Sequence, residues 1–280
     1  MSSNEPAAAD FIDSARYPLD QADDPVTCAL VARCRAELVE RAVCVVERLL
    51  TPDALAAMVA EAERLAPLAH HRAARRNCYI GVEDDPSLPA DHPRRRFMAT
   101  TLGVVADDLI PADSALRALY TWPAFQGFLA AIMGYPALYP NEDRFQALNV
   151  IVYEPGEQSD WHFDPDNEFT VTLLLQEADE GGAFSLVPDL RSAAGENYDG
   201  VGRVLDGDAS RVVGVARPPG SLVVFRGHDS LHRVAPVSGA RRRLVAVMCY
   251  EDRPGVVGDP AVNAAIYGPR AAALQADDSQ

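Results

Sequence analysis

The stretch SDWHFDPDNEFTVTLLL, Ser159 to Leu175, decides the fold that this chain is expected to adopt. It sets His162 and Asp164 two residues apart and then continues into an apolar run of branched residues, which is typical of a β-strand. Residues two apart in an extended segment point to the same side, so the imidazole and the carboxylate are expected to lie together. The sequence therefore predicts a polar site at the mouth of a strand.

Composition indicates a soluble globular protein and excludes several classes of partner. The chain has 280 residues, of which 48% are hydrophobic and 24% charged, which fits one large domain. A formal net charge of −16 disfavours nucleic acid and anionic membranes. The acidic amino terminus lacks the features of a secretory signal, and no segment approaches the ~20 apolar residues of a membrane helix. The five scattered cysteines favour free thiols in a reducing cytoplasm, so we expect a cytoplasmic protein.

The chain is expected to form a single domain over residues 25–280, preceded by a loosely ordered arm. Residues 1–24 are polar, acidic and rich in Ala and Pro, which is typical of a terminal segment that packs weakly. From Pro25 onward, apolar residues follow at helical spacing, and residues 42–50 then give a short branched run that indicates a strand.

Further helices and a long loop are expected before the main strands. Thr51 is a good N-cap and Pro52 suits the first helical position, so a helix is expected to begin there. Residues 114–134 resume helical spacing, although Pro123 must bend or divide that helix. Residues 68–112 are highly charged, contain several prolines and have no clear period, so they are expected to be mostly loop. A loop of this length is often functional.

The remainder of the chain is typical of a β-protein. From Arg144 onward, short branched runs are separated by Gly, Pro and Asp turns, as in a sandwich or barrel. We therefore expect an α+β fold in which a distorted jelly-roll barrel, with a core of about residues 145–250, is covered by amino-terminal helices.

A second histidine is expected to complete a site with His162 and Asp164. His228 and His232 both follow the branched run at 220–225. Two histidines and one carboxylate on one face of a metal leave three positions open, which suits a non-haem Fe(II) that must bind a co-substrate and oxygen. His232 is preferred because it leads directly into a glycine turn, whereas His228 sits inside a Gly-His-Asp-Ser turn and remains the alternative.

An arginine is expected at the far end of such a site. A dicarboxylate bound to iron at one end needs a fixed cation at the other, and a guanidinium fork supplies paired hydrogen bonds. Arg241 and Arg243 are expected on one face of the last strand, with Arg242 pointing the other way. We prefer Arg241, nine residues after His232, and keep Arg243 as the alternative.

Four motifs occur in an order that resembles a known family. WHFD, EGGAF, GSLVVF and LHRVAPVSGARRRL, within residues 145–250, are similar to the Fe(II)/2-oxoglutarate-dependent dioxygenases of the double-stranded β-helix fold. The resemblance implies Fe(II), 2-oxoglutarate as co-substrate and O2. It implies His162, Asp164 and His232 as iron ligands, Arg241 as the residue that binds the distal carboxylate of 2-oxoglutarate, and Asn149 and Tyr153 as further co-substrate contacts.

A narrower resemblance concerns the reaction. The segments HFDPDNEFTVTLLLQEADEGGAF, YEDRPGVV and YGPR resemble the branch that contains the free-amino-acid radical halogenases, of the lysine halogenase type, and their hydroxylase relatives. Halogenases of that branch carry glycine where this chain has Asp164. Because a carboxylate fills the position that chloride would take, the resemblance implies hydroxylation of an aliphatic C–H bond in a small molecule, a free amino acid.

Four residues are candidates for substrate contacts, each with a simpler reading. Arg96, which precedes the FMATT segment, is a candidate to clamp a substrate carboxylate, although Arg94–Arg96 also fits a solvated loop with ion pairs. Glu142 and Asp166 are candidates to pair with a substrate amine, but both also fit ordinary surface charges. Tyr267, in YGPR, fits either a lid or packing.

Two other functional classes remain open. The same iron centre would also suit a carrier-bound or peptide substrate, or a desaturation. A barrel of this kind would also suit a sensor or storage module that binds a small ligand without turnover.

Overall fold

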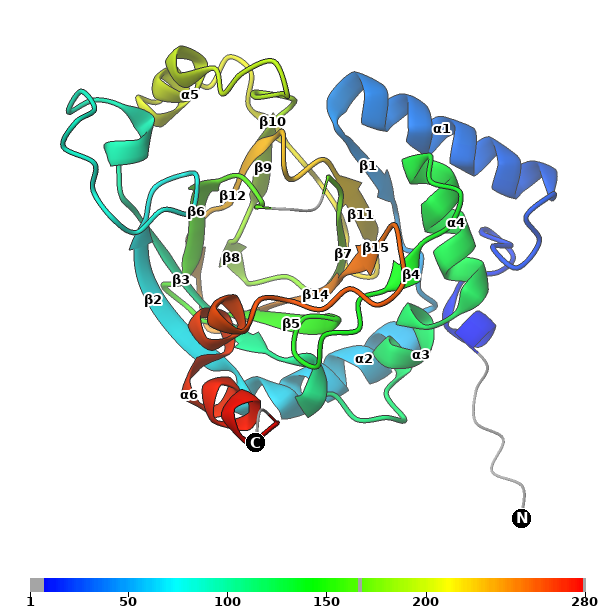
Figure 1. Cartoon of the computed structure of the whole chain (residues 1–280). Helices are drawn as coiled ribbons and strands as arrows, with labels where there is room; N and C mark the ends of the chain where they lie inside the picture. The colour runs from blue at the N-terminus through cyan, green and yellow to red at the C-terminus, as the bar shows by residue number, and fades with distance from the viewer. Residues whose placement is uncertain (1–7, 166–167, 279–280) are drawn as a thin grey trace.

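The strands form one curled antiparallel sheet, which Figure 1 shows end-on as a ring. The computed structural model describes residues 8–165 and 168–278. The 11-stranded sheet has the order β1-β11-β7-β14-β5-β3-β6-β12-β9-β10, and β2 pairs with β3 off this path. Its strands are β1 (Val43–Val46), β2 (His70–Arg76), β3 (Met98–Val105), β5 (Leu148–Tyr153), β6 (Gln158–His162), β7 (Thr170–Gln176), β9 (Phe184–Val187), β10 (Val213–Gly214), β11 (Leu222–Phe225), β12 (Leu231–Val234) and β14 (Arg243–Met248). Two short ladders join β8 (Glu180–Gly181) to β13 (Val237–Ser238) and β4 (Tyr139–Pro140) to β15 (Tyr250–Glu251).

The sheet curls because one strand belongs to both of its halves. β3 pairs with β5 through Gly103–Val105 and with β6 through Thr100 and Thr101. The chain direction alternates at every pairing, and the inner side chains of both halves therefore face a common interior. This arrangement is the expected α+β barrel with covering helices.

The helices begin where the local sequence favours them. They are α1 (Pro25–Arg41), α2 (Pro52–Leu65), α3 (Ala115–Tyr120), α4 (Pro123–Met133), α5 (Tyr198–Leu205) and α6 (Pro260–Asp278), with 3-10 turns η1 (Ala8–Phe11), η2 (Ala66–Leu68), η3 (Pro93–Arg95) and η4 (Asp107–Leu109). The Thr51 hydroxyl accepts a hydrogen bond from the Ala54 amide, as expected for an N-cap. Pro123 opens α4 and so divides the expected helix into two.

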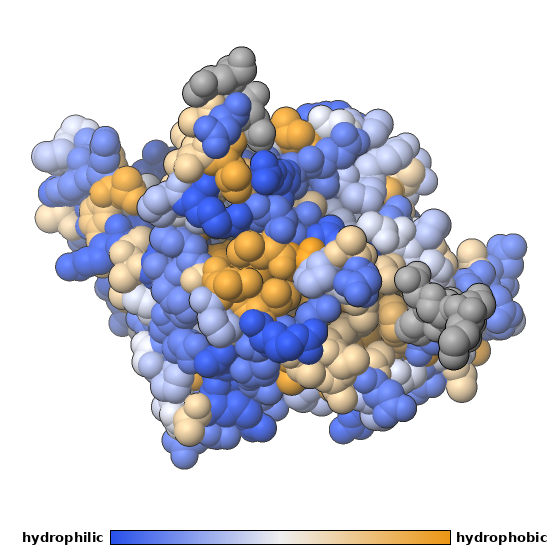
Figure 2. All heavy atoms as spheres, turned by 90° about the horizontal axis from the view of Figure 1, so that it is seen from below, coloured by the Kyte–Doolittle hydropathy of each residue, from blue (hydrophilic) through white to orange (hydrophobic). Residues whose placement is uncertain are grey.

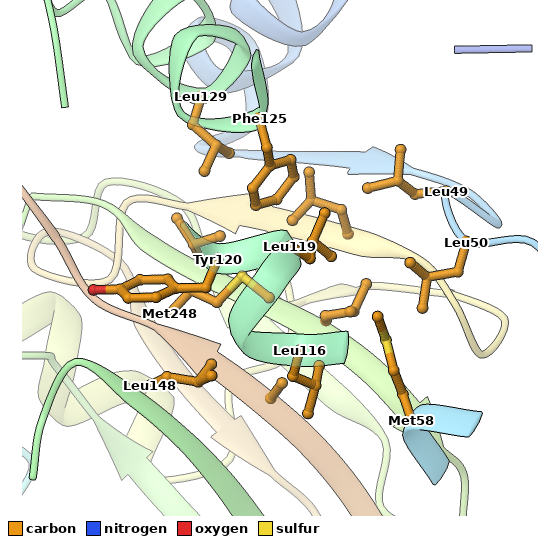
Figure 3. Close-up of a cluster of buried hydrophobic side chains, with 14 of the residues drawn as sticks. Leu49, Leu50, Met58, Leu116, Leu119, Tyr120, Phe125, Leu129, Leu148 and Met248 are labelled. Atoms are coloured by element: carbon orange, nitrogen blue, oxygen red, sulfur yellow. The ribbon is translucent and has the colours of Figure 1, made fainter. Parts of the chain in front are cut away.

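A large apolar cluster fixes the outer face of the sheet. In Figure 3, Met58 of α2, Leu119 of α3 and Phe125 of α4 gather with Leu148 of β5 and Met248 of β14. All five side chains are 2% exposed or less, and fully burying such a side chain contributes about 1.5–3 kcal/mol. This packing holds the strands rigidly enough to position the polar groups on their inner face.

The amino-terminal arm is better ordered than its composition indicates. Phe11, Ile12 and Tyr17 are buried in the main apolar cluster, and the Thr51 amide donates to the Phe11 carbonyl at 2.9 Å. The expectation of a loosely ordered arm is therefore wrong for residues 8–24, because their few apolar side chains cover the edge of the core. Residues 1–7 lie outside the described residues.

Residues 68–112 lie mostly outside strands, as expected, but two strands within this segment were not expected. β2 and β3 form a hairpin there, and both strands belong to the sheet, as does β1. The barrel consequently extends beyond residues 145–250. The sequence hides β2 because its partly buried face consists of His70, Arg72, Ala74 and Arg76, so burial alternates along the strand while hydrophobicity does not.

The face seen in Figure 2 is largely hydrophilic, with a prominent apolar patch near its middle. Within the described residues, no helix is both long enough and apolar enough to span a membrane.

Candidate metal centre

Two histidines face each other across neighbouring strands. His162 ends β6 and is the register partner of His232 on β12, with ring centroids 4.2 Å apart. Asp164 Oδ1 lies 3.8 Å from His162 Nε2 and 3.5 Å from His232 Nε2. The three ligand atoms all lie within 4.8 Å of one another, which leaves room for one metal ion between them.

Hydrogen bonds fix the form of both imidazoles. The Nδ1 atom of His162 lies 2.8 Å from the Asp160 carbonyl oxygen, and that of His232 lies 2.9 Å from the Ser230 carbonyl oxygen. A carbonyl only accepts, so each Nδ1 carries the proton and each Nε2 directs its lone pair toward Asp164. Burial, and then the charges of His232 and Arg76, lower the pKa of His162 well below its usual value. Neutral His162 with a free Nε2 is the form that binds a metal.

The carboxylate of Asp164 is held by two neighbours that sequence reasoning did not identify. The Thr170 hydroxyl, at the start of β7, donates to Asp164 Oδ2 at 2.5 Å. Gly227 lies directly against the same oxygen, so any side chain there would collide with it. Burial alone would raise the pKa of Asp164, but His232, His162 and Thr170 together hold it below its usual value. Asp164 is thus ionised, with Oδ2 occupied and Oδ1 directed at the histidines.

The backbone around the ligands is clamped from both sides. The Asp164 amide donates to the Gly227 carbonyl at 3.0 Å. Arg191 donates to the His228 carbonyl at 2.6 Å and to the Asp164 carbonyl at 3.3 Å, while its guanidinium lies 4.3 Å from the Phe163 ring centroid. Arg191 therefore ties the His-x-Asp segment to the turn that precedes β12. Arg191 lies outside the strands, and no motif in the sequence indicated its role.

The structure separates the two candidate histidines. His228 has a side chain that is 42% exposed and pairs with Asp229, so it lies outside the cluster. His232 is 4% exposed and belongs to the cluster. The preferred assignment matches the geometry.

The structure also distinguishes the two candidate arginines, but here it favours the alternative, Arg243, over the preferred Arg241. Arg241 has a side chain that is 54% exposed, pairs with Asp179 at 3.3 Å, and lies in the turn before β14. Arg243 opens β14, is 3% exposed, and lies with its guanidinium 5.6 Å from the ring centroid of its cross-strand partner Tyr153. The choice of Arg241 is therefore corrected to Arg243, because Arg241 does not reach the barrel interior.

A second buried guanidinium accompanies Arg243. Arg217 is 7% exposed, donates to the Thr172 hydroxyl at 3.2 Å and lies over the Phe184 ring. Burial, and then the charge of Arg243, lower the pKa of Arg217 well below its usual value. Within the described residues, the Arg243 guanidinium has no side-chain hydrogen bond or ion pair, and Glu177, the carboxylate whose charge acts on both arginines, is exposed.

Two more arginines face the same interior from β2. Burial raises the pKa of Tyr153, whereas the charges of Arg243, Arg217, Arg76 and Arg72 lower it, so four guanidinium groups lie within electrostatic range of this side chain. Arg76 also interacts with the charge of Asp164. Neither β2 arginine was singled out in the sequence, because the segment around them looked like a loop.

Asn149, one of the two weaker co-substrate candidates, contacts Tyr267, which was a candidate for substrate binding. The Tyr267 hydroxyl donates to Asn149 Oδ1 at 2.8 Å, and both side chains are buried. Tyr267 also stacks on Phe145, with ring centroids 5.7 Å apart. The pair joins α6 to β5, and each residue therefore has a clear packing role.

The other predicted substrate residues do not gather at the cluster. Arg96 pairs with Asp206 at 2.7 Å and donates to the Leu205 carbonyl, so it caps the carboxyl end of α5. The expectation that Arg96 clamps a substrate is corrected accordingly. Glu142 is exposed and accepts from the Gly255 amide, which makes it a loop anchor. Asp166 lies outside the described residues.

A comparison with family models decides the relationship. The model described as "HalD: Halogenase D" matches residues 26–257, which is most of the chain. The chain belongs to the halogenase D family. A search of curated proteins found no significant match.

Solved structures show the same fold as this halogenase D family member. A 2OG-Fe(II) oxygenase family oxidoreductase from Burkholderia pseudomallei has a TM-score of 0.54 at 17% identity, covering 81% of this chain and 92% of the other. The epimerase SnoN in complex with Fe3+, alpha ketoglutarate and nogalamycin RO has a TM-score of 0.55 at 20% identity, covering 83% and 93%. HygX from Streptomyces hygroscopicus, with nickel, 2-oxoglutarate and hygromycin B, has a TM-score of 0.54 at 12% identity, covering 80% and 88%. These solved structures share the expected double-stranded β-helix fold with the chain.

The residues present fit iron and 2-oxoglutarate, both of which the SnoN structure contains. Two neutral imidazoles and one carboxylate on a single face are the donor set of non-haem iron. The buried and unpaired Arg243 fits the distal carboxylate of 2-oxoglutarate. His162, Asp164 and His232 thus suit iron, and Arg243 suits 2-oxoglutarate.

Proposed function

We propose that this protein is an Fe(II)/2-oxoglutarate-dependent hydroxylase that acts on an aliphatic C–H bond of a small molecule, a free amino acid. The observation that carries the proposal is the position of Asp164, whose Oδ1 lies 3.5–3.8 Å from both imidazoles and completes a three-ligand set. In a halogenase family, a carboxylate at this position leaves no place for a halide on the metal.

The chain's own residues hold the metal and leave one side of it open. His162, Asp164 and His232 bind from β6, the segment after β6, and β12, all on one face. Thr170 keeps Asp164 Oδ2 engaged, which favours binding through Oδ1 alone. Iron held there would supply the oxidising chemistry, with oxygen and 2-oxoglutarate as reactants.

Arg243 and Arg217 would orient 2-oxoglutarate. The fixed Arg243 guanidinium at the start of β14 would bind the distal carboxylate and so direct the keto acid end toward the three ligands. Arg217, which shares the same buried region, adds a second positive charge and keeps its orientation through Thr172. The structures of SnoN and HygX, each with a metal and this co-substrate, support the assignment by their fold.

Hydroxylation is favoured over halogenation by the charge at the metal. A carboxylate ligand is an oxygen donor suited to Fe(II), and it occupies the position that glycine leaves free in the halogenases. The relatives with solved structures include an epimerase and a carbocyclase, so the fold alone does not fix the outcome. Asp164 is the local feature that favours transfer of oxygen.

The test measures co-substrate use and product mass together. The purified protein with Fe(II), 2-oxoglutarate and oxygen is incubated with a panel of free amino acids, and succinate and products are quantified by mass spectrometry. We expect substrate-stimulated succinate and a product that has gained one oxygen atom. Loss of two hydrogen atoms would indicate a desaturase, stimulation by only a carrier-bound or peptide substrate would change the substrate class, and no 2-oxoglutarate consumption at all would indicate a binding protein.

A variant with a conservative change provides the control. Asp164→Asn keeps the size of the side chain but removes its charge, so metal binding and turnover should both fall. Asp179→Asn changes an exposed carboxylate that pairs with Arg241 and should leave both intact.

A further inference from the structure

β2 presents two cations to the barrel interior without any partner for them. Arg72 and Arg76 alternate with exposed residues on this strand, and both are partly buried. The Nε atoms of both side chains are buried and make no hydrogen bond. Within the described residues, neither guanidinium takes part in an ion pair. An unpaired buried donor is unfavourable, so such groups are expected to meet a ligand.

The two guanidinium groups belong to one region beside the metal ligands. Arg72 lies within electrostatic range of the Tyr153 and Tyr267 hydroxyls, and Arg76 lies within electrostatic range of Tyr153 and of the carboxylate of Asp164. Burial, and then the charge of Arg72, lowers the pKa of Arg76 to about 10. The pair therefore places two positive charges near the metal ligands.

The charges of the loaded site do not balance without a further anion. Four guanidinium groups and a divalent metal carry six positive charges, while Asp164 and a 2-oxoglutarate dianion carry three negative ones. Glu177, the other carboxylate that acts on Arg217 and Arg243, is exposed. Three positive charges therefore remain uncompensated after metal and co-substrate are bound, and Arg72 and Arg76 on β2 carry two of the positive charges in this region.

The acidic side chains Glu142 and Asp143 already have hydrogen-bond partners. Glu142 is exposed and bonded to Gly255, and Asp143 accepts from Phe145, Gln146, Gly258 and Asn263. A second ammonium group, on a basic side chain held near β2, would lie beside two guanidinium groups, which is a repulsive arrangement. The described part of the barrel thus favours anionic substrates over basic ones.

We propose that Arg72 and Arg76 form the substrate site and that the substrate is a dicarboxylic acid of the acidic amino acid type. The inference rests on the proposed function, because it takes the substrate of that same iron centre as the ligand. Two carboxylates would satisfy the two β2 guanidinium groups and would hold the carbon chain between them beside the metal. A basic amino acid offers only one carboxylate and adds a positive charge.

Binding to the loaded protein tests the charge of the substrate directly. L-Glutamate, L-aspartate and L-lysine are titrated calorimetrically into the protein saturated with Fe(II) and 2-oxoglutarate in the absence of oxygen. Saturating 2-oxoglutarate prevents the acidic compounds from occupying the co-substrate site. We expect at least one acidic amino acid to bind ten or more times tighter than L-lysine.

Matched variants locate the site on β2. Arg72→Gln and Arg76→Gln should each weaken binding of the acidic amino acid at least tenfold while leaving 2-oxoglutarate binding unchanged. Arg75→Gln is the control, because Arg75 lies on the exposed face of the same strand and donates to the Phe97 carbonyl. It should bind like the wild type.

Stability without ligand distinguishes a binding role from a structural one. The melting temperature of Arg76→Gln, measured without metal or ligand, should equal or exceed that of the wild type because an unpaired charge has been removed. A clear loss of stability in both β2 variants would show that the two arginines support the fold, and would overturn the proposal.

Other outcomes also overturn it. L-Lysine binding as tightly as the acidic compounds, binding of neither acidic compound, or unchanged binding in both β2 variants would each do so. Hydroxylation of lysine coupled to succinate formation would overturn this inference while supporting the proposed function. Failure of the wild type to bind 2-oxoglutarate would instead count against the proposed function.

Discussion

At the scale of single residues, each side chain of the candidate metal centre has one polar atom in a hydrogen bond and one left for a metal. Asp164 has one oxygen occupied by Thr170, and each imidazole has one nitrogen occupied by a backbone carbonyl. The remaining atom of each residue points at the same small volume. Each ligand is therefore oriented before any metal arrives, which reduces the entropy that binding must overcome.

Asp164→Gly should remove most hydroxylation and convert little of it to halogenation. The change opens a metal position that chloride can take, but a halide also needs space and donors aimed at it, and Thr170 and Gly227 are arranged around a carboxylate. We expect weak iron binding that improves in high chloride and at most a trace of chlorinated product by mass spectrometry. Wild-type hydroxylation in this variant would show that Asp164 is not a ligand.

Arg243→Ala should weaken 2-oxoglutarate binding strongly, whereas Arg241→Ala should not. Loss of hydrogen bonds to a charged partner costs about 1.5–3 kcal/mol, which corresponds to a roughly 10- to 150-fold weaker affinity. Arg241 is exposed and paired with Asp179, so its removal serves as the control. Anaerobic titration of 2-oxoglutarate into both Fe(II)-loaded variants measures the difference, and a larger effect at Arg241 would restore the original assignment.

At the scale of elements, the metal would join strands that the backbone connects only loosely. β6 and β12 pair at His162 and His232, but their register shifts before Val234. The Asp164 segment reaches the same point through one hydrogen bond to Gly227 and the Arg191 clamp. A metal bound by all three ligands would therefore link β6, β12 and the segment after β6 near the open end of the barrel.

Metal binding should stabilise the wild type, and His232→Ala should lose that stabilisation. Free metal at about 100 times its Kd adds roughly 2.7 kcal/mol to the free energy of unfolding. Melting curves with Fe(II) and with a chelator, in the absence of oxygen, give the increment. His228→Ala, which alters a histidine outside the cluster, should keep the full increment. The reverse result would move the ligand assignment to His228.

At the scale of the whole molecule, the helices and the amino-terminal segment support the barrel from outside. α2, α3 and α4 cover the outer face of the sheet through one apolar cluster, and residues 8–24 add to the same cluster. The candidate metal ligands lie on the inner face, where a second buried apolar cluster that includes Phe184 and Phe225 packs against His232.

Ile12→Ala should destabilise the protein although it lies in a segment of polar composition. Ile12 is 2% exposed, and an Ile→Ala change in a core typically costs about 2–5 kcal/mol. Val26→Ala, at a side chain that is 51% exposed, should change stability by less than about 0.5 kcal/mol. Chemical denaturation compares the two, and an effect of Ile12→Ala as small as that of Val26→Ala would show that the segment is held loosely.

The sequence by itself determined the class of fold and the three residues that cluster as the candidate metal centre. Hydrophobic strand runs after residue 144, the Thr51–Pro52 helix start and the break at Pro123 are local signals that the structure retains. The His-x-Asp pair at the mouth of a strand and the later His232 are likewise readable, because residue spacing in a strand fixes the face on which a side chain lies.

Only the tertiary structure decided which arginines face the interior. Arg241 and Arg243 have the same parity, but β14 begins at Arg243, and the Arg241 amide is bonded to Asp179 in a turn where the period of two does not apply. β2 escaped detection because its inner face is polar, and a strand is recognised in sequence by alternating hydrophobicity, not by alternating burial. Pairing with β3 turned those charged residues inward, and that long-range contact has no local signature.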